Sequence, residues 1–386
     1  IIYTIYNIYN IMNTKLQEKL EEFLSSIYIM SHSYSSVSSY RLGITNNNNT
    51  GFHEFLFQIY GLDELELIDK IKQNEIDVYD VLNKFVIFLD TKGYKPKGIH
   101  SRLSAVKGFL RHLKADVSSD ICKQRVRLPR TIRKREQPLT KELISQLLRN
   151  LSPKLQTVIL VLSASGMRLG ELVQFRLDDI DFTTTPVTIR LRAETTKTRT
   201  ERDVYLTKEA TQSLKDYLQR FFGWSESSEN FHLQDKVIFG SPNSNNSKNK
   251  QPPHLQAESL LQNTLRYHIK KLPQLCIKNG DNRHVIHFHA LRKFFRTIVG
   301  DTCGRDFAEE MIGHRFYMDT YYQLSTEKRK EMYLKAEPFL TVSDYKAVEN
   351  NMKSLSVKYQ NLESKVDDLM SYLRTNSIEV PDFLRS

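Results

Sequence analysis

Cysteine is scarce in this sequence, and its spacing excludes two kinds of cross-link. Only three cysteines occur among 386 residues, Cys122, Cys276 and Cys303, and none lies in a Cys-x-x-Cys pair. Disulfide frameworks and thiolate zinc sites both need paired or closely spaced cysteines. The sequence therefore predicts neither a disulfide nor a metal site, and a reducing cytoplasm is the expected location.

Long apolar runs are also missing. The apolar N-terminal stretch Ile1–Met12 falls short of the roughly 18 to 20 residues that span a bilayer. It also lacks the basic flank and cleavage site of a signal peptide. We therefore expect no membrane segment and no signal peptide. The chain begins with Ile, so Met12 and Met30 are both candidates for the true start.

Acidic residues are outnumbered by basic ones. The 45 Asp and Glu residues face 56 Lys and Arg residues, which gives a net charge of +11 and a pI near 9.3. A surplus of positive charge favours a polyanionic partner such as nucleic acid, although many basic proteins bind no specific anion.

Apolar spacing predicts a mainly α fold with a small antiparallel β-sheet (α+β). Helical periodicity runs from Phe52 to about Ala115 and resumes after Pro138. Two β-rich runs, Val187–Leu191 and Asp203–Leu206, flank a polar connector and predict a hairpin.

Composition divides the chain into six segments. Residues 31–50 are rich in Ser and Asn, which predicts a loose tether, and apolar residues beyond position 344 alternate three and four apart, as in a coiled coil. The predicted order is a poorly ordered extension (1–50), a helical domain (51–117), a basic interdomain linker (118–136), a second domain (137–342), a coiled-coil helix (343–375) and a tail (376–386).

Two groups of basic residues are candidates for contact with DNA phosphates. Lys95 and Lys97 lie in a Gly- and Pro-containing break between predicted helices, and a basic run follows in the predicted linker. A solvated turn and a solvated charge run are the ordinary alternatives for the two groups. The linker candidates are Arg125, Arg127, Arg130, Arg133, Lys134 and Arg135.

Three motifs place cationic groups where they can bind an anion. Arg168 follows Gly166, which is suited to end one helix, so that Arg168 begins the next. An arginine that merely pairs with Glu171 is the alternative. Lys197 lies in the hairpin connector, where a loop can bring its ammonium group to a substrate.

The third motif is His-Ala-Leu-Arg-Lys-Phe-Phe-Arg, residues 289–296. Helical spacing puts His289 and Arg292 on one face together with Lys293 and Arg296, while apolar residues take the opposite face. Guanidinium donors match phosphate oxygens in pairs. A basic face of this kind is suited to a phosphate, or is simply solvated.

In their order along the chain, these residues resemble the catalytic signature of the tyrosine recombinases. The matching residues are Arg168 in G-M-R-L-G-E-L, Lys197 in T-K-T, His289 and Arg292 in H-A-L-R, His314 in I-G-H, and the tyrosine pair Tyr321-Tyr322. The likeness extends over about residues 52 to 340. The run Y-L-K-A-E-P-F-L-T, with its trailing heptads, is most similar to integrases of archaeal type.

The resemblance implies a helical core-binding domain, a catalytic domain and a site-specific recombinase that acts through a 3′-phosphotyrosyl intermediate. In the implied roles, Arg168 and Arg292 clamp the phosphate, Lys197 protonates the leaving oxygen, and His289 and His314 assist. The partner is double-stranded DNA, on which a homo-tetramer assembles, and no cofactor is needed.

The resemblance leaves the nucleophile and two other functions open. The family pattern Y-Y-x-x-[ST] favours Tyr321, with Tyr322 as the alternative. A type IB topoisomerase shares the chemistry, and an inactive DNA-binding descendant would lack one of the catalytic residues, none of which is missing here.

Overall fold

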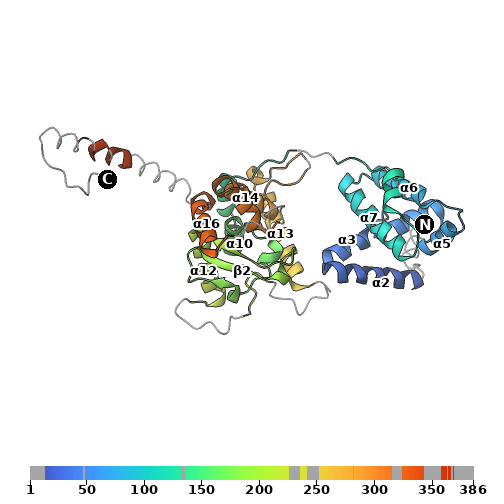
Figure 1. Cartoon of the computed structure of the whole chain (residues 1–386), viewed down its shortest axis with the longest axis horizontal. Helices are drawn as coiled ribbons and strands as arrows, with labels where there is room; N and C mark the ends of the chain where they lie inside the picture. Colours follow the sequence, from blue (N-terminus) through green and yellow to red (C-terminus); the bar gives the residue numbers. More distant parts are fainter. Residues whose placement is uncertain are drawn as a thin grey trace. The chain divides into compact units, whose positions relative to one another are not determined.

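The computed structural model describes residues 14–46, 48–131, 135–225, 235–240, 252–280, 282–314, 324–342, 358–362, 364–366 and 368. The chain divides into two compact units, residues 1–133 and 134–386, both visible in Figure 1. The fold class is confirmed: helices dominate, and three short strands form one antiparallel sheet.

The first unit is built from helices around one apolar core. Phe85 and Phe109 are fully buried in that core. The break predicted near Lys92 is confirmed, because α6 ends at Thr91 and α7 starts at Pro96. The helices described in this unit are α2 (Thr14–Ser31), α3 (Tyr34–Ile44), α4 (Phe52–Tyr60), α5 (Glu64–Lys72), α6 (Val78–Thr91), α7 (Pro96–His112) and α8 (Ser119–Arg125).

The predicted disorder of the N-terminal region is wrong for residues 14–44. These residues form α2 and α3, and α2 buries an apolar stripe that includes Leu16, Leu20 and Phe23. The Ser-rich segment becomes helical because the Ser33 side chain caps α3. Gly43 then allows close packing on α7, because a Cβ there would lie 2.9 Å from Ala105 Cβ. Residues 1–13 lie outside the described part.

The predicted linker also begins too early. Residues 119–125 form α8, and Cys122 and Val126 are buried in the core of the first unit. The Asn83 amide donates to the backbone oxygen of Arg125 at 2.8 Å. Apolar residues spaced along this basic stretch therefore hold its first part against α6.

The second unit surrounds one buried helix, α10. Nearly every residue of α10 from Leu155 onward is buried, as expected for a helix that is apolar on all sides. It contacts α12, α14, α16 and strand β3 (Figure 1). The described helices are α9 (Lys141–Leu148), α10 (Pro153–Ser165), α11 (Leu169–Leu172), α12 (Lys208–Phe222), α13 (Pro253–Lys271), α14 (Phe288–Cys303), α15 (Arg305–Ile312) and α16 (Thr326–Leu340).

The sheet consists of β1 (Ile180–Asp181), β2 (Val187–Leu191) and β3 (Arg202–Leu206), in that order. The predicted hairpin is confirmed, with Val187 opposite Leu206 and Leu191 opposite Arg202. Strand β1 was not predicted, because two residues are too few to show a period of two.

The predicted coiled coil, residues 343–375, lies mostly outside the described residues. Three positions of its seam are described, and Tyr359, Leu362 and Val366 are 71%, 60% and 51% exposed. Self-association through this segment stays a prediction.

If α2 is part of the core, truncating Leu20 will destabilise the first unit. Leu20 is 1% exposed, so Leu20→Ala should lower the free energy of unfolding by about 2 to 5 kcal/mol. Urea unfolding of the full chain measures this change. The control is Ile29→Ala on the same helix, where the side chain is 69% exposed and the change should stay within about 0.5 kcal/mol. Equal effects of the two substitutions would contradict the packing of α2.

Candidate active site

Arg168 occupies the turn that follows α10. Gly166 ends that helix with a φ of +64°, and a Cβ at this position would overlap the Phe295 ring. As predicted, Arg168 begins the next helix, α11, where its backbone N–H donates to Glu171 Oε2 at 2.7 Å. Because α11 has only four residues, its dipole adds little to anion binding.

Arg292 lies at the meeting point of two helix ends, and it is buried. One Nη donates to the Gly166 carbonyl at 2.7 Å and the other donates to the Ile312 carbonyl. Carbonyl groups at helix C-termini have no partner within their own helix, so one guanidinium satisfies the ends of α10 and α15 together.

The predicted shared face of α14 is therefore only partly right. His289 and Lys293 are exposed, whereas Arg292 is 3% exposed and is packed among the apolar residues of the helix. The helical spacing was correct, but two carbonyls in the interior provide the partners that draw Arg292 inward.

The charge of Arg292 survives its burial. Burial lowers the pKa of Arg292 to about 9, and the neighbouring Arg168 adds to the decrease, while Glu171 opposes it. A guanidinium with a pKa of about 9 is still protonated at neutral pH. Two positive groups from distant parts of the sequence are thus held close together.

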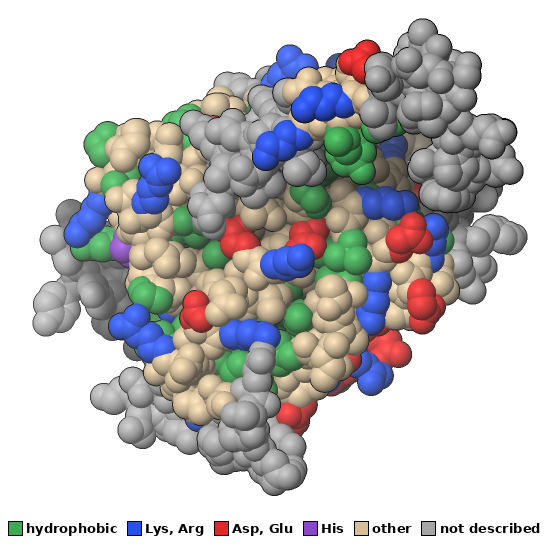
Figure 2. Space-filling view, turned by 90° about the vertical axis from the view of Figure 1, so that its left-hand side faces the viewer, with side chains coloured by type: hydrophobic (Ala, Val, Ile, Leu, Met, Phe, Trp, Pro, Cys, Tyr) green, Lys and Arg blue, Asp and Glu red, His purple; other side chains and the backbone are tan. Residues whose placement is uncertain are grey.

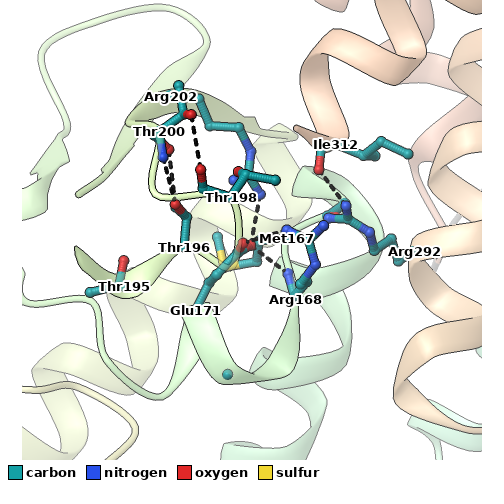
Figure 3. A network of polar contacts seen from close by, with 12 residues as sticks. Met167, Arg168, Glu171, Thr195, Thr196, Thr198, Thr200, Arg202, Arg292 and Ile312 are labelled. Atoms are coloured by element: carbon teal, nitrogen blue, oxygen red, sulfur yellow. Dashed lines mark hydrogen bonds and ion pairs between the residues drawn. The ribbon is translucent and has the colours of Figure 1, made fainter. Parts of the chain in front are cut away.

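Glu171 joins Arg168 to a third arginine. Its carboxylate is 1% exposed and accepts from Arg168 Nη1 at 2.8 Å and from Arg202 Nη2 at 2.7 Å (Figure 3). Burial acts to raise the pKa of Glu171, but Arg202 and Arg168 together outweigh it and hold the pKa below its usual value. The pairing of Arg168 with Glu171 is therefore real, and it leaves the Arg168 side chain partly exposed.

His314 is held at the end of α15 by a carboxylate. Its Nδ1 lies 2.7 Å from Glu309 Oε2, and Glu309 also accepts from Arg296 Nε at 2.7 Å. Burial acts to raise the pKa of Glu309, but hydrogen bonds from Arg296 and His314 lower it overall. The His314 side chain remains 46% exposed, so its other ring nitrogen can reach a ligand.

The surroundings of His289 favour its neutral form. Partial burial of its ring lowers the pKa of His289, and the nearby Lys293 and Arg292 lower it further. A neutral imidazole carries one donor and one acceptor nitrogen. His289 can therefore donate a hydrogen bond or accept a proton beside Arg292.

Lys197 is exposed in the connector between β2 and β3, as predicted. The hydroxyl of Thr196 braces that connector through the carbonyls of Ala193 and Thr200, at 3.1 and 3.0 Å. The neighbouring Thr198 lines a cavity of roughly 180 Å³ together with Gly313 and His314. Thr198, the residue after Lys197, therefore lies on the side of the unit that carries His314, whereas Lys197 itself does not line this cavity.

The tyrosines predicted to attack, Tyr321 and Tyr322, lie outside the described residues, as do Arg133 and Lys134. The described chain resumes at Leu324 and enters α16. In that helix the fully buried Tyr333 donates its hydroxyl to the Ala164 carbonyl at 2.9 Å.

Comparison with known proteins supports the same interpretation. A family model described as the phage integrase family matches residues 137–327, about half of the chain and most of the described part of the second unit. The chain belongs to the phage integrase family. It is a tyrosine-type site-specific DNA recombinase, and its partner is DNA.

Solved structures share the fold of this recombinase at low sequence identity. A lambda integrase (residues 75–356) dimer bound to a COC' core site is 13% identical with a TM-score of 0.52, and covers 81% of this chain and 99% of that one. A second lambda integrase dimer on a COC' core site is 12% identical with a TM-score of 0.50, and covers 81% of this chain and 79% of that one. No curated protein sequence matches the chain.

The basic residues proposed to contact DNA divide into two kinds. Arg125 is paired with Asp77 at 2.5 Å, so its charge is partly neutralised within the first unit. The other described candidates are all exposed, and they are Lys95, Lys97, Arg127, Arg130 and Arg135. On the face shown in Figure 2, Lys and Arg side chains are interspersed with Asp and Glu. Charge on that face does not mark a DNA-binding surface.

Two further classes of site, a membrane span and a metal site, are absent from the described residues. No helix there has the length and apolar character needed to cross a bilayer. Within the same part of the chain, no three His, Cys, Asp or Glu side chains are grouped as a metal would require.

The sequence alone did not identify Arg202 or Glu309 as site residues. It indicated for Glu171 only the role of an ordinary ion-pair partner of Arg168. Arg202 had a usable signal, because it alternates with Val204 and Leu206 on one face of a strand, where a charge is unexpected. Glu309 had none, since its link to His314 appears only once α15 ends in a turn at Gly313.

The Glu309 contacts predict a pH dependence of stability. A carboxylate with a lowered pKa stabilises the fold above its ordinary value of 4.5, and this contribution is lost as the pH falls below that value. Glu309→Gln should lower the free energy of unfolding at pH 7 by about 1 to 3 kcal/mol and make its decline in acid shallower. Unfolding in urea across a pH series measures both effects.

The matched control is Glu201→Gln. Glu201 is an exposed residue directly before β3, and its carboxylate pairs with Arg190. Its curve should run parallel to that of the wild type. A Glu309→Gln curve parallel to the wild type would show that the Arg296 and His314 contacts do not hold Glu309 in solution.

Proposed function

We propose that Arg168 and Arg292 bind the scissile phosphate of DNA and that Tyr321 attacks its phosphorus. The observation that carries this proposal is the pair of charged guanidinium groups brought together by Glu171 and by the carbonyls of Gly166 and Ile312. Such groups stabilise the charge that develops on the non-bridging oxygens in the transition state, typically by about 3 kcal/mol for one donor.

The histidines and Lys197 complete the proposed site. Neutral His289 lies near Arg292 and can assist phosphate binding or proton transfer. His314, oriented through Nδ1 by Glu309, offers its other ring nitrogen to a phosphate oxygen. Lys197, on the connector beside the cavity lined by His314, supplies the proton to the leaving oxygen.

The proposed reaction conserves the phosphodiester bond energy. The tyrosine oxygen forms a bond to phosphorus as its proton passes to the neutral His289 imidazole, and the bond to the 5′-oxygen breaks as that oxygen takes a proton from Lys197. The products are a 3′-phosphotyrosyl protein and a free 5′-hydroxyl. A 5′-hydroxyl from another strand reverses the step, so rejoining needs neither ATP nor a metal.

Lys95 and Lys97 are proposed to bind phosphates of the flanking duplex. They stand at the first residues of α7, whose first turn contains no acidic residue. Positive side chains at a helix N-terminus are unfavourable by themselves, and a bound phosphate relieves this repulsion. The linker residues Arg127, Arg130, Arg133, Lys134 and Arg135 are proposed to track the backbone in the same way.

Assembly and location are proposed on separate grounds. Strand exchange needs two duplexes with two cleavage sites each, for which a homo-tetramer on DNA supplies one tyrosine per cut. The lambda integrase structures named above contain dimers on a core site. The cysteines Cys122, Cys276 and Cys303 are all free thiols, which fits the reducing cytoplasm proposed as the location.

The proposed nucleophile predicts a covalent adduct that depends on one phenol. A duplex selected by binding from a random-sequence pool is nicked beside the cleavage position, so that the cut fragment diffuses away. Without metal, wild-type protein should form an adduct visible on a denaturing gel, whereas Tyr321→Phe forms none and Tyr322→Phe retains it.

Other outcomes of this experiment assign the function differently. Loss of the adduct only in Tyr322→Phe moves the nucleophile by one residue. Relaxation of supercoiled plasmid without a selected sequence points to a topoisomerase. Tight binding of the selected duplex without any adduct points to an inactive DNA-binding protein.

The proposed phosphate contact of Lys97 predicts a change in salt dependence. Lys97→Ala should weaken binding of all duplexes similarly and reduce the slope of log K against log salt by about 1. Fluorescence anisotropy over a salt series measures the slope. Lys70→Ala is the control, because Lys70 is an exposed lysine of the same unit that pairs with Glu75. If the two variants share one slope, Lys97 does not contact phosphate.

A further inference from the structure

Arg202 is a buried arginine for which the proposed reaction has no role. It begins strand β3, and its side chain is only 9% exposed. Nη2 donates to Glu171 Oε2 at 2.7 Å (Figure 3). Nε donates to the Met311 carbonyl at 3.2 Å. Arg202 therefore connects the partner of Arg168 with the end of α15.

The contacts of Arg202 run parallel to those of Arg292. Two consecutive carbonyls at the end of α15 each accept from a different guanidinium, Met311 from Arg202 and Ile312 from Arg292. Gly313, with a φ of +63°, then turns the chain toward His314, and a Cβ at Gly313 would lie 3.0 Å from Arg202 Nη1. The path to His314 thus passes directly over Arg202.

The charge of Arg202 is costly if its role is only to fill space. Its Nη1 is buried and has no hydrogen-bond partner among the described residues, and a buried unpaired donor costs about 1 to 3 kcal/mol. Apolar side chains often replace buried ion pairs without loss of stability. The arrangement is understandable if the guanidinium is needed to orient its neighbours.

We propose that Arg202 is a positioning residue for DNA cleavage. It holds the Glu171 carboxylate so that Arg168 presents its guanidinium to the scissile phosphate, and its contact with the Met311 carbonyl keeps the Arg202 side chain in place. Arg202 does not touch the substrate. This inference rests on the proposed function, since it assumes that Arg168 binds the phosphate.

The first test compares cleavage rates at saturating protein. Arg202→Ala should slow single-turnover cleavage of the nicked selected duplex by about 10- to 100-fold, because small misplacements of a catalytic group have effects of this size. Affinity for the duplex should change less than twofold. Arg202→Lys keeps the charge but not both contacts, and should give an intermediate rate.

The matched control is Arg190→Ala. Arg190 lies on the adjacent strand β2, is 66% exposed and pairs with Glu201. The Arg190→Ala substitution removes an arginine from the same sheet without affecting a contact of Glu171. The cleavage rate of this variant should equal that of the wild type.

A second substrate separates positioning from a merely structural role. A duplex with a neutral methylphosphonate at the scissile position needs less positive charge from Arg168. The deficits of Arg202→Ala and Arg168→Ala relative to wild type should both shrink on this duplex, while the deficit of Lys197→Ala persists. With the ordinary phosphate, the Arg168→Ala/Arg202→Ala double variant should be no slower than Arg168→Ala.

Three outcomes would overturn the inference. The first is a wild-type cleavage rate for Arg202→Ala. The second is an Arg202→Ala rate deficit of equal size on the ordinary and the methylphosphonate duplex. The third is a double variant whose rate is reduced by the product of the two single reductions. If Arg202→Ala does not fold, Arg202→Lys and Glu171→Gln decide, and each must show the smaller deficit on the neutral substrate. If the wild type itself forms no adduct, the proposed function fails instead.

Discussion

The second unit depends on one buried guanidinium group. Arg292 satisfies the Gly166 carbonyl after α10 and the Ile312 carbonyl at the end of α15, and both segments continue directly into site residues. Helix ends leave carbonyl groups that must find donors, and here a positive side chain supplies them. These two contacts of Arg292 in the core therefore also fix the directions from which Arg168 and His314 enter the candidate site.

Positive charge is concentrated at this site, and a nearby carboxylate offsets part of the electrostatic repulsion between the guanidinium groups. Arg168, Arg202 and Arg292 lie around the buried carboxylate of Glu171, so these four side chains together carry a net positive charge. In the free protein this excess is repulsive, and the phosphate group proposed to bind here would relieve it. Folding thus places the positive groups in position before any anion binds, which is what electrostatic preorganisation requires.

Much of this site could be predicted from the sequence, because helical periodicity and motif order are local signals. The turn at Gly166, the β2–β3 hairpin and the exposed connector at Lys197 all follow from short stretches. Arg292 was placed on the correct helix but on an open face, because its partners come from segments 126 and 20 residues away. The helices α2 and α3 were missed for different reasons. The Ser-rich composition of residues 31–50 hid α3, whereas the helical spacing of Leu16, Leu20 and Phe23 was a usable signal for α2 that was not used.

The anchoring of α16 has a consequence for the timing of the reaction. Tyr333 fixes α16 to the Ala164 carbonyl on α10, and Glu309 fixes His314 at the other side of the tyrosine-bearing stretch. The residues on either side of positions 315–323 are therefore both held within the second unit. In the proposed reaction, the effective molarity of the Tyr321 phenol is then set by the length of chain between these two fixed points rather than by diffusion. Lengthening this part of the chain by a few residues would dilute the proposed nucleophile without altering the residues proposed to bind the phosphate.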